Sequence, residues 1–248
     1  MTNAEQRNKE VRTTYGAHQL ARDVDLPELD GWAWDIPGAG PGVEVFGGLK
    51  GLRALDLGSG LGRQAAFLAS LGAKVTALEA APTQHQRALA RYPATPGLRL
   101  ICADAATHLQ RADPYDLIYS IGGVPFMDPN RLLRALSNAL RPGGRLLFSA
   151  LHTNSAGPSS TVAPRPEILR LPGTTEDHTV HMWVLKPQLW EDLIVAHGLT
   201  VETVSTIDCL DAGQPLSYRL YTARRPVREG EHLRPLPRGR RPGSEQPW

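Results

Sequence analysis

Three carboxylates stand at or near the ends of short apolar runs in this sequence: Asp56, Glu79 and Asp104. Asp56 leads into the glycine-rich turn Leu57–Gly62, where bare backbone can approach a ligand closely. Glu79 has the position at which a carboxylate can accept hydrogen bonds from both hydroxyls of a ribose. Asp104 can accept a hydrogen bond from the amino group of adenine, while Ala105 offers backbone to the ring. The pattern therefore predicts a site for a ligand that contains adenosine.

The glycine turn discriminates between two such ligands. A dinucleotide-binding turn would place its third glycine at position 63, where this chain has Arg63, and Asp56 would set a carboxylate beside a pyrophosphate. S-adenosylmethionine has no phosphate and carries an ammonium and a sulfonium, so an anionic strand end suits it better. We therefore predict S-adenosylmethionine as the cofactor. The residues expected to bind it are Asp56, Gly58, Ser59, Gly60, Glu79, Ala80, Asp104 and Ala105.

A sheet of parallel strands would bring these residues together. The expected strands are 53–57, 74–79, 98–103, 115–120 and 145–151, and helical patterns at 63–70 and 82–91 lie between them. Such alternation is typical of βαβ units that bury a parallel sheet on both faces. Asp128 should cap a further helix, Pro187 should open the last one, and 199–209 with 217–223 should form an antiparallel pair.

These features resemble class I S-adenosylmethionine-dependent methyltransferases. The resemblance rests on 55–62, Glu79, Asp104 and 115–151, and Leu140-Arg141-Pro142-Gly143-Gly144 is similar to the turn that this family places before its fifth strand. It implies an α/β fold: a Rossmann-like, doubly wound, mostly parallel seven-stranded sheet with an antiparallel last strand. It also implies that Ser120 and Ile121 lie against the methionine part of the cofactor, and that Tyr15 belongs to a segment covering it.

The chain is expected to divide into three parts. Residues 1–50 would cover the cofactor site, and 51–224 would form the methyltransferase domain. Residues from about 152 to 178 are rich in Ser, Thr, Pro and Gly and show little periodicity, which favours a lid beside the substrate. Residues 225–248 repeat Arg, Pro and Gly, and we expect this tail to be disordered because it has little apolar surface to bury.

The reaction leaves fewer traces in the sequence. Enzymes that methylate amide or nucleobase nitrogens typically carry Asn or Asp, two prolines and an aromatic residue after the fourth strand, where this chain has 120–123, Ser-Ile-Gly-Gly. Asp128 and Asn130 could be metal ligands, but a helix cap explains Asp128 better, and we predict no metal. His152 is the best-placed candidate for a general base. The alternatives are His18, His178 and His181.

Four tryptophans bear on the acceptor pocket. Trp32, Trp34 and Trp183 could line it or pack as ordinary core, whereas Trp190 sits in an expected helix and should belong to the core. The two cysteines, Cys102 and Cys209, have no metal-ligand spacing and are expected to be buried, inert thiols.

The charge distribution argues against a nucleic acid as substrate. The net charge of +2 depends on arginines after residue 223, so the rest of the chain has no overall basic excess. The expected acceptor is a small organic molecule methylated on O, N or C, because the sequence resembles tailoring methyltransferases of bacterial secondary metabolism and antibiotic biosynthesis. Alternatives are an RNA methyltransferase anchored by the basic tail, a reductase or aminopropyl transferase on the same fold, and a non-catalytic scaffold.

The location of the protein follows from what the sequence lacks. No apolar run approaches the roughly 20 residues that a membrane span needs. Residues 1–10 are polar and do not resemble a secretory signal. We therefore expect a cytoplasmic protein, and the sequence gives no indication of its oligomeric state.

Overall fold

The computed structural model describes residues 1–23, 26–35, 39–153, 157–208 and 217–227, with His152, Thr153 and Asp208 described by their backbone alone. Most of the predicted tail lies outside these residues. The helices are α1 (Asn3–Ala21), α2 (Arg63–Ser70), α3 (Pro82–Arg91), α4 (Ala105–Leu109), α5 (Pro129–Ala139) and α6 (Pro187–Ala196), with short 3-10 helices at Val43–Phe46 and Val124–Phe126. The strands are β1 (Arg53–Leu57), β2 (Lys74–Glu79), β3 (Leu98–Cys102), β4 (Tyr115–Ser120), β5 (Leu140–Thr153), β6 (Arg165–Arg170), β7 (Asp177–Met182), β8 (Thr200–Asp208) and β9 (Ser217–Arg224).

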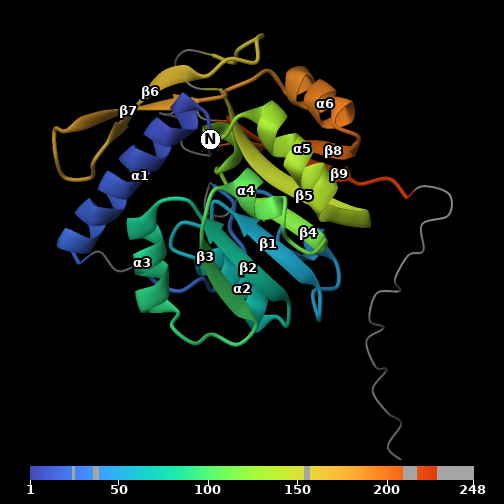
Figure 1. The fold of residues 1–248 in the computed structure, drawn as a ribbon, viewed down its shortest axis with the longest axis horizontal. Coiled ribbons are helices and arrows are strands. Elements are labelled where there is room, and N and C mark those ends of the chain that lie inside the picture. The colour runs from blue at the N-terminus through green and yellow to red at the C-terminus, as the bar shows by residue number, and fades with distance from the viewer. Residues whose placement is uncertain (24–25, 36–38, 154–156, 209–216, 228–248) are drawn as a thin grey trace, which may run out of the picture.

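Seven strands form one sheet in the order β3-β2-β1-β4-β5-β9-β8 (Figure 1). The pairs among β1 to β5 are parallel, and β9 runs antiparallel to both β5 and β8. The predicted Rossmann-like sheet with an antiparallel last strand is confirmed. The strand order reverses between β1 and β4, which is where ligands bind in open α/β sheets, beyond the carboxyl ends of the strands.

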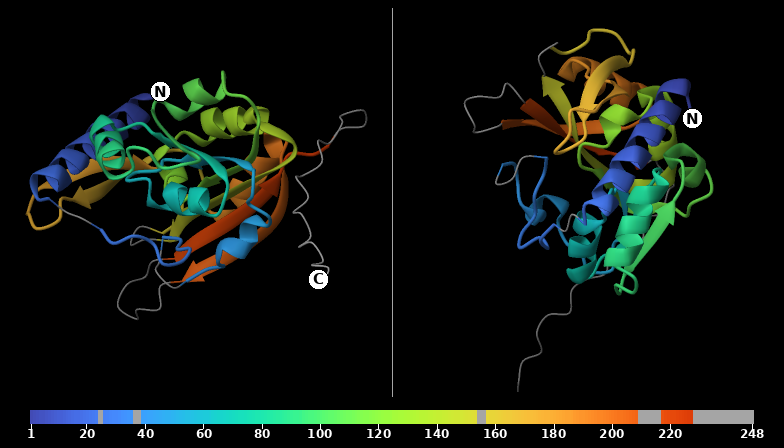
Figure 2. Two further views of the ribbon diagram at one scale, coloured as in Figure 1. Left: turned by 90° about the horizontal axis from the view of Figure 1, so that it is seen from below. Right: turned by 90° about the vertical axis from the view of Figure 1, so that its left-hand side faces the viewer.

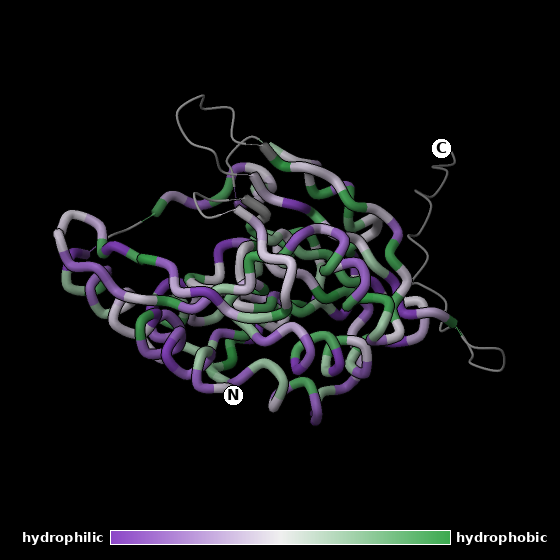
Figure 3. The backbone as a smooth tube through the Cα atoms, turned by 90° about the horizontal axis from the view of Figure 1, so that it is seen from above, coloured by the Kyte–Doolittle hydropathy of each residue, from purple (hydrophilic) through white to green (hydrophobic). Residues whose placement is uncertain are grey.

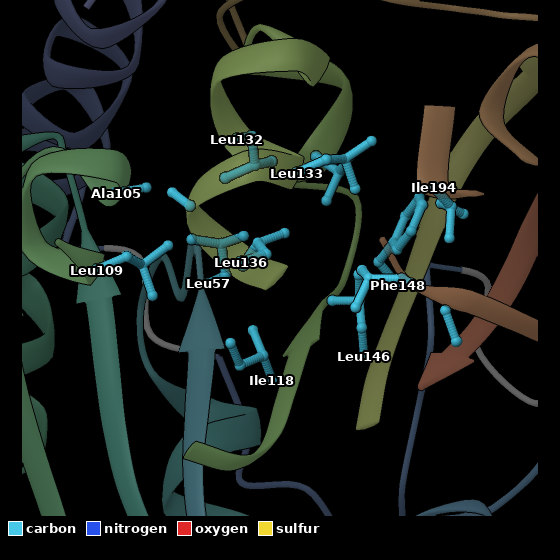
Figure 4. Close-up of a cluster of buried hydrophobic side chains, with 14 of the residues drawn as sticks. Leu57, Ala105, Leu109, Ile118, Leu132, Leu133, Leu136, Leu146, Phe148 and Ile194 are labelled. Carbon is cyan, nitrogen blue, oxygen red and sulfur yellow. The ribbon is translucent and has the colours of Figure 1, made fainter. Parts of the chain in front are cut away.

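Helices cover both faces of this sheet. One buried cluster joins β1, β4 and β5 to α4, α5 and α6, and Figure 4 shows Leu57, Ile118 and Leu136 pointing toward one another within it. The other cluster packs α2 and the segment before β1 against the opposite face. Hydrophobic backbone segments accordingly concentrate in the middle of the molecule (Figure 3). Burial on both faces explains why the strands appear in the sequence as continuous apolar runs.

The N-terminal segment adds a long helix and an aromatic cluster. Helix α1 begins with a capping box between Thr2 and Glu5 and lies along α3 and β7 (Figures 1 and 2). The rings of Trp32 and Trp34 meet edge to face, with their centroids 5.6 Å apart, and both pack near Phe46. These two tryptophans therefore act as core, and the pocket interpretation does not apply to them.

Three local predictions were wrong. The segment expected to lack periodicity contains the β6–β7 hairpin, whose Ile168 is 64% exposed, so no apolar face marks the strand in the sequence. Strand β5 begins at Leu140 rather than at position 145, because the Pro-Gly-Gly turn forms a bulge inside the strand. Cys102 is exposed, since it ends β3 at the outer edge of the sheet.

The helix caps follow the sequence more closely. Asp128 accepts hydrogen bonds from the backbone N–H groups of Asn130 and Arg131, at 3.0 and 3.2 Å, so its predicted role as an N-cap is confirmed. Trp190 is buried in α6, as expected. Among the described residues, no helix is long and apolar enough to cross a membrane.

Candidate functional site

A cavity opens beyond the carboxyl ends of β1, β2 and β3, beneath α1. It holds about 730 Å³ of empty space, a figure that includes the open solvent at its mouth. The strand ends and their loops contribute Leu57, Gly58, Leu78, Glu79, Ala80, Ala103, Asp104, Ala105, Ile121, Gly122, Gly123, Phe126 and Met127. Helix α1 and the residue before its cap contribute Met1, Glu5, Asn8, Lys9 and Arg12.

The glycine turn forms the floor of the cavity. Gly58 has a φ of +73°, a backbone conformation that residues with a Cβ rarely adopt. The N–H groups of Gly58 and Ser59 both donate to the carbonyl of Leu78, at 2.9 and 3.1 Å, so the end of β1 is fixed against the end of β2. The turn thereby presents backbone rather than side chains to the cavity.

Glu79 is held in place by backbone donors on both sides. Its Oε2 accepts from the Gly60 N–H at 2.9 Å and its Oε1 accepts from the Ala81 N–H at 2.8 Å. Each carboxylate oxygen can accept a second hydrogen bond. The carboxylate is therefore oriented before any ligand binds, with acceptor capacity left for a pair of hydroxyls.

Asp104 caps α4 and contacts α5 at the same time. Its Oδ1 accepts from the Thr107 N–H at 3.0 Å, from the Thr107 hydroxyl at 2.7 Å, and from Arg131. Burial raises the pKa of Asp104, but the hydrogen bonds from Arg131 and Thr107 outweigh it and hold the pKa below its ordinary value. All three donors converge on Oδ1, so the other oxygen is left as an acceptor.

Arg131 links this carboxylate to helix α1. Its Nη1 donates to Glu5 Oε1 at 3.0 Å, while its Nη2 contacts Asp104. Asn8 provides a second attachment of α1, because its side chain donates to the carbonyls of Phe126 and His181 and accepts from the His181 N–H. Helix α1 is therefore fastened over the cavity from α5 and from β7.

Six of the predicted cofactor residues line the cavity, namely Gly58, Glu79, Ala80, Asp104, Ala105 and Ile121. Five others, Tyr15, Asp56, Ser59, Gly60 and Ser120, are not among its lining residues. Ser120 is fully buried and donates to the Leu57 carbonyl at 2.7 Å, which ties β4 to β1. The Gly60 N–H donates to Glu79, so Gly60 orients a residue that lines the cavity without lining it itself.

Asp56 has an environment unlike that of the other two carboxylates. It lies within β1, and burial raises its pKa to about 7, although the neighbouring Tyr119 hydroxyl acts in the opposite direction. Its side chain is 3% exposed. Asp56 therefore faces the interior of the sheet rather than the cavity.

Two basic residues at the cavity were missed in the sequence. Lys9 and Arg12 lie on α1, and the Arg12 guanidinium stacks over the rings of Tyr15 and Phe126, 5.4 and 5.8 Å from their centroids. They are separated by one helical turn, so they project from the same face of α1. The polar pattern of residues 3–21 could have indicated a helix. It does not show which part of the sheet that helix packs against.

The candidate base is only partly located. The backbone of His152 lies in β5, and its side chain is outside the described part of the chain. Among the alternatives, His18 contacts the Pro172 carbonyl at 2.9 Å, and His178 contacts Glu176 at 3.0 Å. The role of His152 therefore stays a prediction.

Comparison with known proteins finds methyltransferases. Residues 55–148 match the family model described as a methyltransferase domain. The ubiquinone biosynthesis O-methyltransferase of Cronobacter sakazakii is 28% identical over 241 residues, which is 84% of this chain and 97% of that protein. The fold resembles an S-adenosylmethionine-dependent methyltransferase from Mesorhizobium loti, with 24% identity, a TM-score of 0.54, and 72% and 93% of the two chains covered. It also resembles the [4+2]-cyclase SpnF, with 16% identity, a TM-score of 0.63, and 91% and 98% covered.

The matched segment of the chain includes Gly58, Glu79 and Asp104, which line the cavity. The chain therefore carries a methyltransferase domain over residues 55–148, and its fold is that of solved S-adenosylmethionine-dependent methyltransferases. Its cofactor is S-adenosylmethionine.

Proposed function

We propose that the cavity beneath α1 binds S-adenosylmethionine and that the enzyme methylates a small organic acceptor in a bacterial biosynthetic pathway. The observation that carries this proposal is the placement of two oriented carboxylates, Glu79 and Asp104, around a bare-backbone turn at the switch point of the sheet. Both carboxylates retain acceptor capacity toward the cavity. That donor and acceptor set fits an adenosine that has no phosphate.

Each part of the cofactor has a partner in this arrangement. Glu79 would accept from the two ribose hydroxyls, and the second oxygen of Asp104 would accept from the adenine amino group. Lys9 and Arg12 provide positive charge for the carboxylate of the methionine part. The resemblance to the family predicts that Ile121 lies against the methionine part, and Ile121 lines the cavity together with the neighbouring Gly122.

The bound cofactor supplies a methyl group on a sulfonium, which is a good leaving group. The protein therefore contributes mainly by holding the acceptor in line with that methyl, an effect worth up to roughly 7–11 kcal/mol. Helix α1 contributes Glu5, Asn8, Lys9 and Arg12 to the lining of the cavity. This arrangement suits an acceptor small enough to enter beside α1.

The ubiquinone biosynthesis relatives are O-methyltransferases by name, which supports an oxygen acceptor here. A nitrogen acceptor is also compatible with the fold, because a solved neighbour from Burkholderia thailandensis is a 1,6-didemethyltoxoflavin-N1-methyltransferase. A role in secondary metabolism and a cytoplasmic location are part of the proposal.

Thermal unfolding with S-adenosylhomocysteine and, separately, with NAD tests the cofactor site. A ligand at 100 times its dissociation constant stabilises the fold by about 2.7 kcal/mol. We expect S-adenosylhomocysteine to raise the Tm and NAD to leave it unchanged. Glu79→Gln should weaken this response, whereas Glu10→Gln, an exposed position on α1, should retain it. A Tm raised by NAD alone would overturn the assignment.

A further inference from the structure

A second cavity lies against the sheet beside its edge strand β3. It holds about 750 Å³ of empty space, a figure that includes open solvent. Strands β1, β3 and β4 and helix α4, with the segment after it, contribute side chains to its lining. Among them are Arg53, Arg99, Thr107, His108, Arg111 and Tyr115. None of these six residues lines the cofactor cavity, so the proposed methyl transfer does not account for them.

The strand residues of this cavity share one face of the sheet. Side chains alternate along a strand, so Arg53 lies on the same face as Leu55, and Arg99 lies on the same face as Ile101. Leu55 and Tyr115 belong to the core cluster that α4 and α5 cover, and Ile101 packs against it. Helix α4 and strand β3 have five residues each, and a helix of that length spans about 7.5 Å against about 16 Å for the strand. Helix α4 is therefore too short to cover the whole of β3, and the cavity lies beside it.

This cavity gathers positive charge with little compensation. Within the described part of the chain, the exposed side chains of Arg99 and Arg111 form no ion pair or hydrogen bond with another residue. Arg53 contacts Asp113 at 3.8 Å, but the Asp113 side chain is 87% exposed, and such exposed pairs contribute little. The Arg53 guanidinium also stacks on Tyr115, 4.8 Å from the ring centroid. Three guanidiniums thus face one carboxylate, which leaves two positive charges (3 − 1) at the cavity.

His108 shows that these charges converge. Its Nε2 lies 3.0 Å from the Tyr115 hydroxyl. Burial lowers the pKa of His108, and the positive charges of Arg99 and Arg53 lower it further. The imidazole is therefore mostly neutral at pH 7 and adds hydrogen-bonding capacity without charge. An anion in the cavity would relieve the repulsion among the guanidiniums.

The charge and shape of the cavity favour a dianionic phosphate over other anions. A guanidinium binds a carboxylate or a phosphate through two parallel hydrogen bonds. A carboxylate carries one negative charge, whereas a terminal phosphate carries about 1.5 to 2 at pH 7 and has three acceptor oxygens. The phosphodiesters of a nucleic acid carry one charge each and are spread along a chain, but the arginines here converge on one cavity. The two uncompensated positive charges therefore match a terminal phosphate.

We propose that the second cavity is a binding site for a dianionic phosphate, with Arg53, Arg99 and Arg111 as its charged donors. Free phosphate and an organic phosphomonoester present the same dianion to these guanidiniums. The Thr107 hydroxyl and His108 line the same cavity and supply further polar groups.

The proposed site adjoins the cofactor cavity without being part of it. Ala103 lines both cavities. Thr107 lines the second cavity, and its hydroxyl donates to Asp104, which lines the first, at 2.7 Å. A phosphate in the second cavity and a cofactor in the first would therefore occupy separate spaces that share a wall.

Isothermal titration calorimetry at about pH 8 and low ionic strength tests the site with phenyl phosphate, inorganic phosphate and benzoate. We expect wild type to bind both phosphates more tightly than benzoate. Arg99→Gln and Arg111→Gln should each weaken phenyl phosphate binding about tenfold, because each removes charge-assisted hydrogen bonds. Arg134→Gln, which replaces an exposed arginine on α5, should stay within about twofold of wild type. All three positions are exposed, so the variants should keep the Tm of wild type.

The same titrations contain the outcomes that would overturn the proposal. These are a wild type that binds neither phosphate, benzoate that binds as tightly as phenyl phosphate, and equal phosphate affinities in all four proteins. Phenyl phosphate that binds more tightly than inorganic phosphate would identify an organic phosphomonoester as the ligand class. Equal or tighter binding of inorganic phosphate would identify free phosphate, and either result supports the site.

A second experiment separates this site from the cofactor cavity, where Lys9 and Arg12 also carry positive charge. Arg12→Gln and saturating S-adenosylhomocysteine should both leave phenyl phosphate binding unchanged. Loss of that binding in either case would place the phosphate in the cofactor cavity and overturn the proposal. An oligouridylate that binds wild type more tightly than phenyl phosphate does, and loses affinity in Arg99→Gln, would indicate a nucleic acid and also overturn it. The first titrations need no cofactor, so their outcome does not depend on the proposed function.

Discussion

Removing the Arg131 guanidinium should loosen helix α1 from the body of the enzyme. Arg131 joins Glu5 on α1 to Asp104 at the end of β3. In Arg131→Gln, the buried Glu5 carboxylate keeps only the N–H groups of Thr2 and Asp128, at 2.7 and 3.2 Å. Removing one partner of a fully buried ion pair costs about 3–5 kcal/mol. Because the Arg131 side chain is 25% exposed, we expect about 2–3 kcal/mol here.

That loss should lower the Tm of the ligand-free protein by about 4–12 °C at this chain length. Thermal and urea unfolding at pH 7 measure it. Arg134→Gln is the matched control, because Arg134 lies exposed on the same helix and should change stability by less than about 0.5 kcal/mol. Arg131→Gln should also weaken S-adenosylhomocysteine binding, since α1 supplies part of the cavity wall.

A double-mutant cycle with Glu5→Gln isolates the contact between α1 and α5. Residues in direct contact show coupling energies of about 0.5–3 kcal/mol, so the double variant should lose less than the sum of the single losses. The pKa of Asp104 is held below its ordinary value, so its stabilising contribution exists above the unfolded pKa and is lost as the pH falls through the folded one. The effect of Arg131→Gln should therefore shrink in acid. Additive losses within about 0.3–0.5 kcal/mol would refute the coupling.

Three further outcomes follow from the same structure. Gly16→Ala should cost about 1–3 kcal/mol in thermal unfolding, because its Cβ would lie 2.3 Å from the Thr83 hydroxyl and 3.0 Å from backbone, whereas Gly31→Ala meets nothing within 4 Å and should be nearly neutral. Asp56→Asn should gain stability relative to wild type as the pH rises from about 4 to about 7, since burial raises the folded pKa to about 7; a difference independent of pH would contradict this. Truncation after Val227 should leave the Tm and the response to S-adenosylhomocysteine unchanged, and an RNA methylation activity that this truncation abolishes would favour the RNA alternative.

The clustering of Glu79 and Asp104 at one cavity could be predicted because these residues belong to neighbouring βαβ units. Glu79 ends a strand, Asp104 follows the next one, and parallel strands bring such positions to one edge of the sheet. Asp56 could not be assigned so simply. It lies inside β1 between Leu55 and Leu57, and alternation along the strand turns its side chain toward Tyr119. A carboxylate one residue before the end of a strand can thus be part of the interior.

The α1 residues and the second cavity could not be predicted from local pattern. Lys9 and Arg12 belong to helix α1, which lies over the carboxyl ends of strands that come much later in the chain. The three arginines of the second cavity come from β1, from β3 and from the segment after α4, and they meet only after the sheet has formed. The β6–β7 hairpin was missed for a different reason, since the half-buried positions of β6 are polar or charged while its Ile168 is exposed, so apolar residues do not alternate toward a buried face.

Asp104 belongs both to the attachment of helix α1, through Arg131, and to the lining of the proposed cofactor cavity. Its Oδ1 holds Thr107 and Arg131, and its second oxygen is free for the cavity, so an adenine amino group and the guanidinium can be bound at once. Binding of the ligand and fastening of α1 therefore do not compete for the same atom. Suppose that the ligand binds tightly only while Arg131 attaches α1 to Asp104. Thermodynamic linkage then requires that a stronger contact between Arg131 and Asp104 raise the affinity for the ligand. Bound ligand must strengthen that contact by the same free energy. Under the proposed function, Asp104 would then both bind the adenine and keep α1 over the cavity.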